Sequence, residues 1–239
     1  MKQEQEEYIE KNIDLIDANK WEEFFNEAPR GIGGFLYDAD IPFLNKLSYI
    51  PVGAFFNCTN LINFDIPDGI IDIKTDAFSN CENLSTIKIP NTVTSIGKCA
   101  FYNCRSLTSI TIPDSVTNID YRTFFGCSSL ASITIPDSVT SIEPYVFAYC
   151  SSLTSINIPD SVTSIGYDAF RGCSSLTSIM IPNSVMNIGE DAFLFCSNLK
   201  KIYFKGTKDE WKSIYNSYSF KNIYFTVHCS DGDIIKKKR

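Results

Sequence analysis

The sequence is poor in the residues that enzymes use for acid–base and metal chemistry. It contains one histidine, His228, in 239 residues, and it lacks a glycine-rich phosphate loop and the H-E-x-x-H and G-x-S-x-G motifs. Cys229 follows His228, but neighbouring residues on a strand point to opposite faces, which argues against a catalytic pair. No C-x2-C spacing indicates a zinc site. We therefore predict a protein that is not an enzyme and needs no cofactor or metal.

Long apolar segments are also absent. Lys2–Glu7 is polar and charged and no continuous apolar stretch follows it, so the sequence predicts no signal peptide, and no run is long enough to span a membrane. These features predict a cytoplasmic chain with no visible export route. The formal net charge is −7, and because phosphate binding needs a basic stripe, a nucleic-acid partner is not expected.

A repeat organises the chain. Leucines follow three residues behind a column of seven cysteines, each 23 positions after the last: Cys58, Cys81, Cys104, Cys127, Cys150, Cys173 and Cys196. A fixed period of this length predicts a solenoid, in which each repeat stacks on its neighbours. The cysteines then form an inward ladder of small apolar side chains, and we expect them to be reduced.

The first half of each repeat predicts a strand with one buried face. Ile133 and Ile135 alternate with polar residues, which is the period of a half-buried strand, and Thr134 then points outward. Pro136 ends the strand because proline has no N–H for a central ladder. Successive repeats should therefore form parallel sheets.

The second half of each repeat predicts a short extended segment and a bend. Val139 and Ile142 should point inward there. We expect the segment that ends at Phe147 to be helix-like, with phenylalanine as the large inward wedge.

The two ends depart from the repeat, as solenoid caps do. Trp21, Phe24 and Phe25 are candidates for the inward face of a helical N-terminal cap. Near the other end, residues 207–214 predict a short helix with Thr207 as N-cap, and residues 223–227 predict a last strand. The sequence thus predicts four parts: an N-terminal cap at 1–40, a repeat array at 41–204, a C-terminal cap at 205–232 and a basic tail at 233–239.

Residues 150–166 read C-S-S-L-T-S-I-N-I-P-D-S-V-T-S-I-G, and this phrase resembles the BspA-like class of leucine-rich repeat. The usual repeat length of that family agrees with the period, and the ending with Gly206, Trp211 and Cys229-x-Asp231-Gly232 is also similar. The resemblance covers about residues 41–232. It implies an α/β-type solenoid, a right-handed coil with parallel β-sheets and short helical caps, used for protein or surface recognition and often found on secreted or cell-surface proteins.

The outer side of the main strands is the candidate ligand face. Its middle is a ladder of serine and threonine with few anchors, whereas interface hot spots favour large side chains such as tyrosine and arginine. Binding specificity is expected where the ladder is interrupted and toward its C-terminal end. The candidate residues are Lys88, Thr111, Thr134, Asn157, Met180, Lys201 and Tyr203.

These patterns predict a monomeric, non-catalytic protein-interaction module for recognition or adhesion. The alternative is a carbohydrate- or surface-binding module of the same architecture. A column of turn residues could instead hold a cation such as calcium, although turn capping explains the same residues: Asp68, Asn91, Asp114, Asp137, Asp160 and Asn183.

Overall fold

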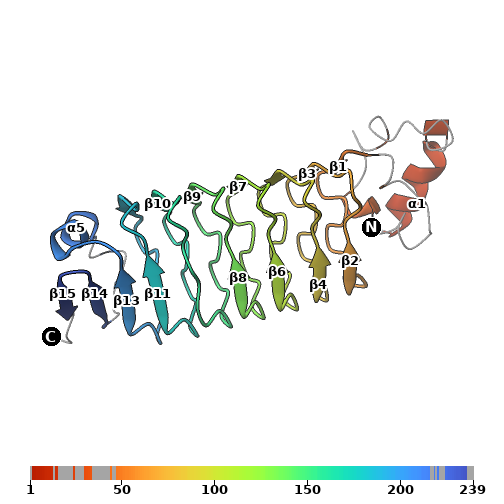
Figure 1. Ribbon diagram of the computed structural model, residues 1–239. Helices are drawn as coiled ribbons and strands as arrows, with labels where there is room; N and C mark the ends of the chain where they lie inside the picture. Colours follow the sequence, from red (N-terminus) through yellow and green to blue (C-terminus); the bar gives the residue numbers. More distant parts are fainter. Residues whose placement is uncertain are drawn as a thin grey trace.

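The structure is a computed structural model of the whole chain, and it describes residues 2–12, 14–15, 24, 30–33, 44, 47–215, 218, 220 and 224–235. The repeats form an elongated solenoid of parallel strands with the chain ends at opposite ends of the coil (Figure 1). This confirms the predicted fold class.

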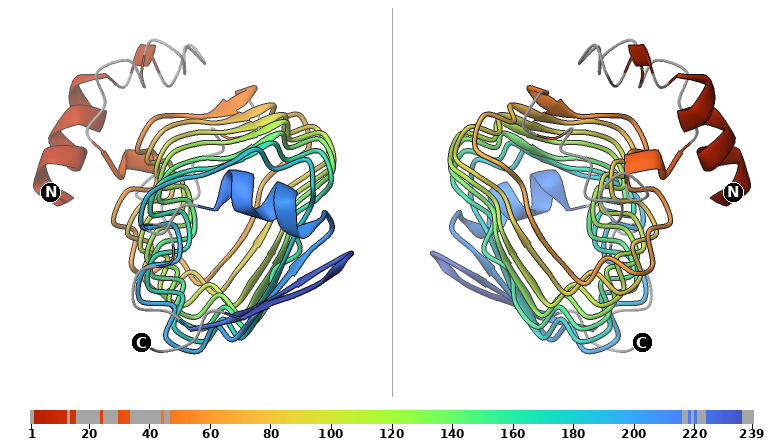
Figure 2. Two further views of the ribbon diagram at one scale, coloured as in Figure 1. Left: turned by 90° about the vertical axis from the view of Figure 1, so that its left-hand side faces the viewer. Right: turned by 90° about the vertical axis from the view of Figure 1, so that its right-hand side faces the viewer.

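Each full turn of the coil has a main strand, assigned in all but one repeat, and a shorter second strand. The main strands are β2 (Asn63–Asp65), β4 (Thr86–Lys88), β6 (Ser109–Thr111), β8 (Ser132–Thr134), β11 (Ser178–Ile181) and β13 (Lys201–Phe204). The second strands are β1 (Tyr49–Ile50), β3 (Asp72–Ile73), β5 (Ser95–Ile96), β7 (Asn118–Ile119), β9 (Ser141–Ile142), β10 (Ser164–Ile165) and β12 (Asn187–Ile188). Viewed along the axis, equivalent segments superpose, so each kind of segment forms its own side of the coil (Figure 2).

The strands pair in parallel without a register shift. Ile110 of β6 pairs with Ile133 of β8, and Ile96 of β5 pairs with Ile119 of β7. In the repeat where no main strand is assigned, isolated bridges at Asn157 continue the ladder from β8 to β11. Each inward side chain therefore meets its counterpart in the next repeat.

The third side of the coil is built from hydrogen-bonded turns, and the helix-like conformation expected up to Phe147 is wrong. Backbone N–H groups there alternate between partners: Ala148 donates to Tyr145 of its own repeat at 3.1 Å, and Phe147 donates to Ala169 of the next at 2.9 Å. Each repeat also has two residues with positive φ on this side, such as Tyr145 at 59° and Tyr149 at 61°. A right-handed helix cannot contain such residues, so the backbone forms stacked turns.

The interior is a set of stacked identical side chains. The phenylalanine column from Phe55 to Phe220 is fully buried, and the rings of Phe101 and Phe124 stack with centroids 5.5 Å apart at an interplanar angle of 3°. Ile133 and Ile135 are 7% and 4% exposed, while Thr134 between them is exposed, as predicted.

The predicted cysteine column is also in the interior. Cys127 donates its thiol hydrogen to the carbonyl oxygen of Phe101 at 3.2 Å, and the same bond links Cys81, Cys104, Cys150, Cys173 and Cys196 to a phenylalanine carbonyl 26 residues earlier. All nine cysteines are free, with only Cys99 and Cys229 partly exposed. Burial raises the pKa of the Cys127 thiol to about 12, so this thiol stays protonated at neutral pH.

At the N-terminal end, helix α1 (Lys2–Lys11) packs beside the first turns. The Tyr8 hydroxyl donates to the carbonyl oxygen of Phe24 at 2.6 Å, and Phe24 is fully buried, as predicted for the cap's inward face. Trp21 and Phe25 lie outside the described residues.

At the C-terminal end, helix α5 (Lys208–Ile214) has Thr207 as its N-cap, as predicted. The Thr207 side chain accepts a hydrogen bond from the Glu210 N–H, and the Glu210 carboxylate accepts one from the Thr207 N–H, forming a capping box. The last strand expected at 223–227 is instead β14 (Thr226–Cys229), followed by an antiparallel β15 (Gly232–Ile235). Residues 233–235 of the expected tail are thus part of the sheet.

We expect Ile133→Ala or Ile135→Ala to lower the free energy of unfolding by about 2–5 kcal/mol, because each leaves a cavity between two stacked repeats. Thr134→Ala, on the exposed face of the same strand, should cost far less. Thermal and urea unfolding would check both. Equal losses for the inward and outward substitutions would contradict the assignment of faces.

We expect at most two thiols, those of Cys99 and Cys229, to react quickly with Ellman's reagent in the native protein. The other seven cysteines are buried and should react only after unfolding in guanidinium chloride. Rapid labelling of more than two native thiols would be inconsistent with this ladder.

The stability of the protein should also depend on pH in the alkaline range. The pKa of the Cys127 thiol is raised in the native protein, so this thiol ionises at a lower pH in the unfolded chain. The free energy of unfolding should therefore fall as pH rises above the usual thiol pKa toward 12.

Candidate functional site

The strand face is the outer side of the main strands, and it displays all seven predicted residues. Six of them occupy the same position in successive repeats. Strand pairing or isolated bridges link the neighbours in this column from Thr111 to Tyr203, through Thr134, Asn157 and Met180. Lys201 lies one column away, paired with Ser178 and Thr226. All seven are exposed: Lys88, Thr111, Thr134, Asn157, Met180, Lys201 and Tyr203.

The middle of the strand face offers short polar groups. Ser109 lies beside Ser132, and Thr111 lies beside Thr134, so neighbouring strands present the same hydroxyls. Such side chains can exchange hydrogen bonds with a ligand or water, but they bury little area. Larger contacts must come from the ends of the face.

The C-terminal end of the strand face gathers bulkier side chains. Tyr203 pairs with His228 of β14, and their rings stack with centroids 5.1 Å apart. Nδ1 of His228 lies 2.9 Å from Oδ1 of Asp233 on β15. Met180 and Tyr203 keep 40% and 39% of their surfaces exposed. We call Met180, Lys201, Tyr203, His228 and Asp233 the C-terminal cluster.

The sequence reasoning missed His228 and Asp233 as members of this face. The sequence predicts a last strand only up to residue 227, so it does not predict the pairing of His228 in β14 with Asp233 in β15. The structure places His228 opposite Asp233 in the antiparallel pair, so both continue the column that Tyr203 belongs to. The alternating apolar and polar residues of 226–229 were the only signal available for this position.

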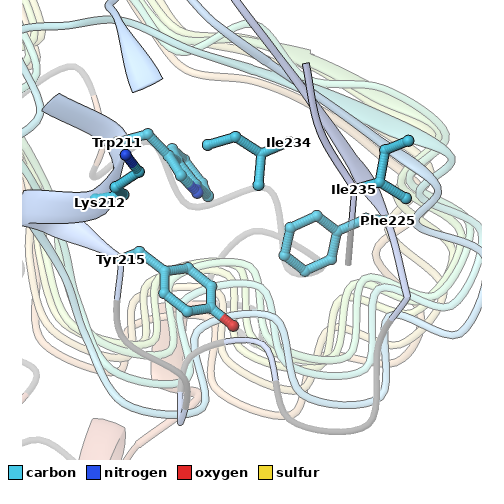
Figure 3. Close-up of a pocket in the computed structure, with 6 residues that line it drawn as sticks. All are labelled: Trp211, Lys212, Tyr215, Phe225, Ile234 and Ile235. Atoms are coloured by element: carbon cyan, nitrogen blue, oxygen red, sulfur yellow. The ribbon is translucent and has the colours of Figure 1, made fainter. Parts of the chain in front are cut away.

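A cavity of about 310 Å³ lies at the C-terminal end of the coil. It is lined by Trp211, Lys212, Tyr215, Phe225, Ile234 and Ile235. Figure 3 shows the Trp211, Tyr215 and Phe225 rings arranged around a shared space, with the Ile234 side chain drawn between the Trp211 and Phe225 rings. Trp211 is buried while Ile235 is 61% exposed, so the cavity extends from the interior to the surface. Most of its lining side chains are apolar or aromatic.

Metal-binding groups do not converge in the part of the chain that the structure describes. No three histidine, cysteine, aspartate or glutamate side chains there are placed to hold an ion, and Asp160 of the turn column instead binds Lys205, with Oδ1 and Nζ 2.5 Å apart. Within the same described residues, no helix has the length and apolarity needed to cross a membrane.

Two of the solved structures that match this chain are leucine-rich repeat proteins. A leucine-rich repeat protein from Bacteroides ovatus ATCC 8483 is 30% identical over 68% of this chain and 48% of its own, with a TM-score of 0.58. The T. pallidum leucine-rich repeat protein is 35% identical over 60% of this chain and 73% of its own, with a TM-score of 0.56. This chain therefore spans about half the length of the Bacteroides ovatus protein. No curated protein matches it significantly.

The repeat itself has a recognised family pattern. The BspA type leucine rich repeat region matches residues 39–154 and 122–231, in six copies. The matched residues include every main strand and the turns between them, and neighbouring main strands pair in parallel 23 residues apart. The chain belongs to the BspA-type leucine-rich repeat family.

Proposed function

We propose that the protein is a non-catalytic recognition or adhesion module that binds a partner protein through the C-terminal cluster of its strand face. The observation that supports this most is the change in side chains along one column, from Thr111 and Thr134 to Met180 and Tyr203. Hot spots of protein interfaces are enriched in tyrosine and sit where neighbouring side chains can exclude water.

The geometry suits a protein partner. Tyr203 presents a ring backed by His228. Lys201, in the neighbouring column of the same strand, and Asp233, beyond His228 in the column of Tyr203, add opposite charges, so an interface could combine apolar burial with complementary polar contacts. A role on a cell surface is part of the proposal because the family resemblance implies it.

The carbohydrate-binding alternative depends on the serine and threonine ladder. Lys88, Asn157 and Met180 interrupt that ladder, so the hydroxyl array is shorter than the sheet. A glycan array probed with the intact protein would test this alternative directly, and binding that persists without Tyr203 would favour it.

We expect Met180→Thr combined with Tyr203→Thr to weaken partner binding about tenfold or more, since both remove large exposed contacts. Threonine is the residue at the same repeat position in β6 and β8, so the sheet should fold normally. Partners captured by cross-linking from host-cell and own-cell lysates would be identified, purified and titrated against each variant.

Met186→Thr is the matched control. Met186 is 72% exposed but lies next to β12 on another side of the coil, and threonine occupies its position in the repeats at 94, 117, 140 and 163. Unchanged affinity in the control with a loss in the double variant supports the proposed site. Equal affinity in the wild type and the double variant would rule it out.

A further inference from the structure

The last strand of the C-terminal sheet has an open edge. β15 ends the strand order β11-β13-β14-β15, and among the described residues it pairs only with β14. Figure 1 shows it as the outermost strand at the C-terminal end of the coil. An edge strand presents backbone N–H and C=O groups that can pair with a further strand. Gly232–Ile235 contains no proline that would block such pairing.

The hydrogen-bond pattern identifies the groups that face the open edge. In an antiparallel pair, residues that bond to the partner strand alternate with residues that do not. The N–H of Thr226 donates to the residue before β13 at 2.9 Å, so the backbone groups of Val227 face β15. Ile234 is the partner of Val227 and therefore faces back toward β14. The N–H and C=O groups of Asp233 and Ile235, on either side of it, point away from β14 along the open edge.

The cavity of about 310 Å³ lies beside this edge, because Ile234 and Ile235 line it together with Trp211 and Phe225 (Figure 3). Ile234 is on the inward face of the sheet, since it pairs with the fully buried Val227. A strand added to β15 would direct every second side chain to that same face. An apolar cavity of roughly 150 Å³ holds a benzene molecule, so this one has room for a large apolar side chain.

The surroundings of the edge are basic. Residues 200–239 contain ten basic and four acidic side chains, although the chain as a whole has a formal net charge of −7. The four acidic side chains already have hydrogen-bond partners within the chain: Asp209, Glu210, Asp231 and Asp233. The Lys208 ammonium lies 2.9 Å from where a Cβ on Gly232 would be, and four basic residues, 236–239, follow Ile235 directly. Electrostatic complementarity therefore favours an acidic occupant.

We propose that the open edge of β15 and the cavity beside it bind an extended segment of a partner protein, with acidic side chains and one large apolar side chain. The segment adds a strand to β15, and its apolar side chain enters the cavity. Only a polypeptide offers the N–H and C=O groups that complement this edge, which argues against a nucleic acid or a glycan. Pairing of two copies through their β15 edges is disfavoured because it brings together two basic ends.

The probe for this proposal is a labelled synthetic peptide of alternating glutamate and threonine with leucine in place of the central threonine. Fluorescence anisotropy measures its affinity for the full chain. One version carries N-methyl groups on its glutamates, and another carries them on the residues between. An added strand uses every second N–H, so one version should bind about tenfold more weakly or worse and the other nearly as the parent does, whichever direction the segment runs. Equal affinities of the two versions would overturn strand addition.

Ile235→Pro removes one N–H of the open edge and no bond to β14, because that N–H points outward. We expect this variant to bind the peptide about tenfold more weakly, with a thermal unfolding midpoint close to that of the wild type. Ile235→Val keeps the N–H and is the matched control, so it should bind as the wild type does. Equal affinity of the two variants would contradict the proposal, and the methylated peptides test it without any change in the protein.

Two further peptides test the chemistry of the segment. Lysine in place of glutamate, or alanine in place of leucine, should each weaken binding about tenfold or more. The Met180→Thr and Tyr203→Thr double variant should bind the peptide as the wild type does, so this site and the C-terminal cluster can fail separately. Equal affinity for the lysine and glutamate peptides would overturn the proposal. Sedimentation that shows a dimer, lost in Ile235→Pro, would also overturn it, since the edge would then bind a second copy of this chain.

Discussion

Every part of the coil depends on the constant spacing of 23 residues between equivalent positions. Only this spacing lets Ile133 pair with Ile110 and Phe124 stack on Phe101. A shift of one residue would turn each strand's inward side chains outward. Since one repeat cannot bury its own apolar faces, stability comes from the interfaces between neighbouring repeats.

The same constraint leaves the outer surfaces free to vary. Inward positions must match their neighbours in size and shape, whereas Thr134 or Met180 on the strand face meets solvent on one side. Departures from the repeat are therefore informative only where they are exposed. By that measure the C-terminal cluster and the exposed turn-side residues Tyr149 and Phe195 differ most from the rest of the coil.

The interior and the strand face could be predicted because they follow from a period of two that is visible in the sequence. Ile133, Thr134 and Ile135 show the alternation directly, and the predicted ligand-face residues are all exposed. The C-terminal cluster was only partly predicted. His228 and Asp233 join Tyr203 through strand pairing of β14 and β15, and the weak alternation of Gly232–Ile235 gave no clear strand signal.

The turn side could not be predicted in full because its conformation is not tied to one residue type. Asparagine and glycine at the position before the cysteine do indicate a left-handed backbone, at Asn57, Asn80, Asn103, Gly126 and Gly172. The other left-handed position accepts glycine, aspartate, cysteine, arginine and tyrosine, so its residues carry no common signal.

Stacking between repeats also explains how bulky residues can hold a left-handed conformation. The N–H groups of Tyr145 and Tyr149 donate to the next repeat at 3.1 and 2.6 Å, and those of Ala148 and Cys150 donate within the same turn. An isolated turn could exchange such a conformation for a less strained one, but here each alternative would break hydrogen bonds to a neighbouring repeat. On the strand face, by contrast, an aromatic residue such as Tyr203 suits the strand backbone and causes no strain. The two surfaces therefore differ in their relation to stability: the C-terminal cluster suits the strand backbone, whereas the left-handed residues Tyr145 and Tyr149 of the turn side are held in place by hydrogen bonds between repeats.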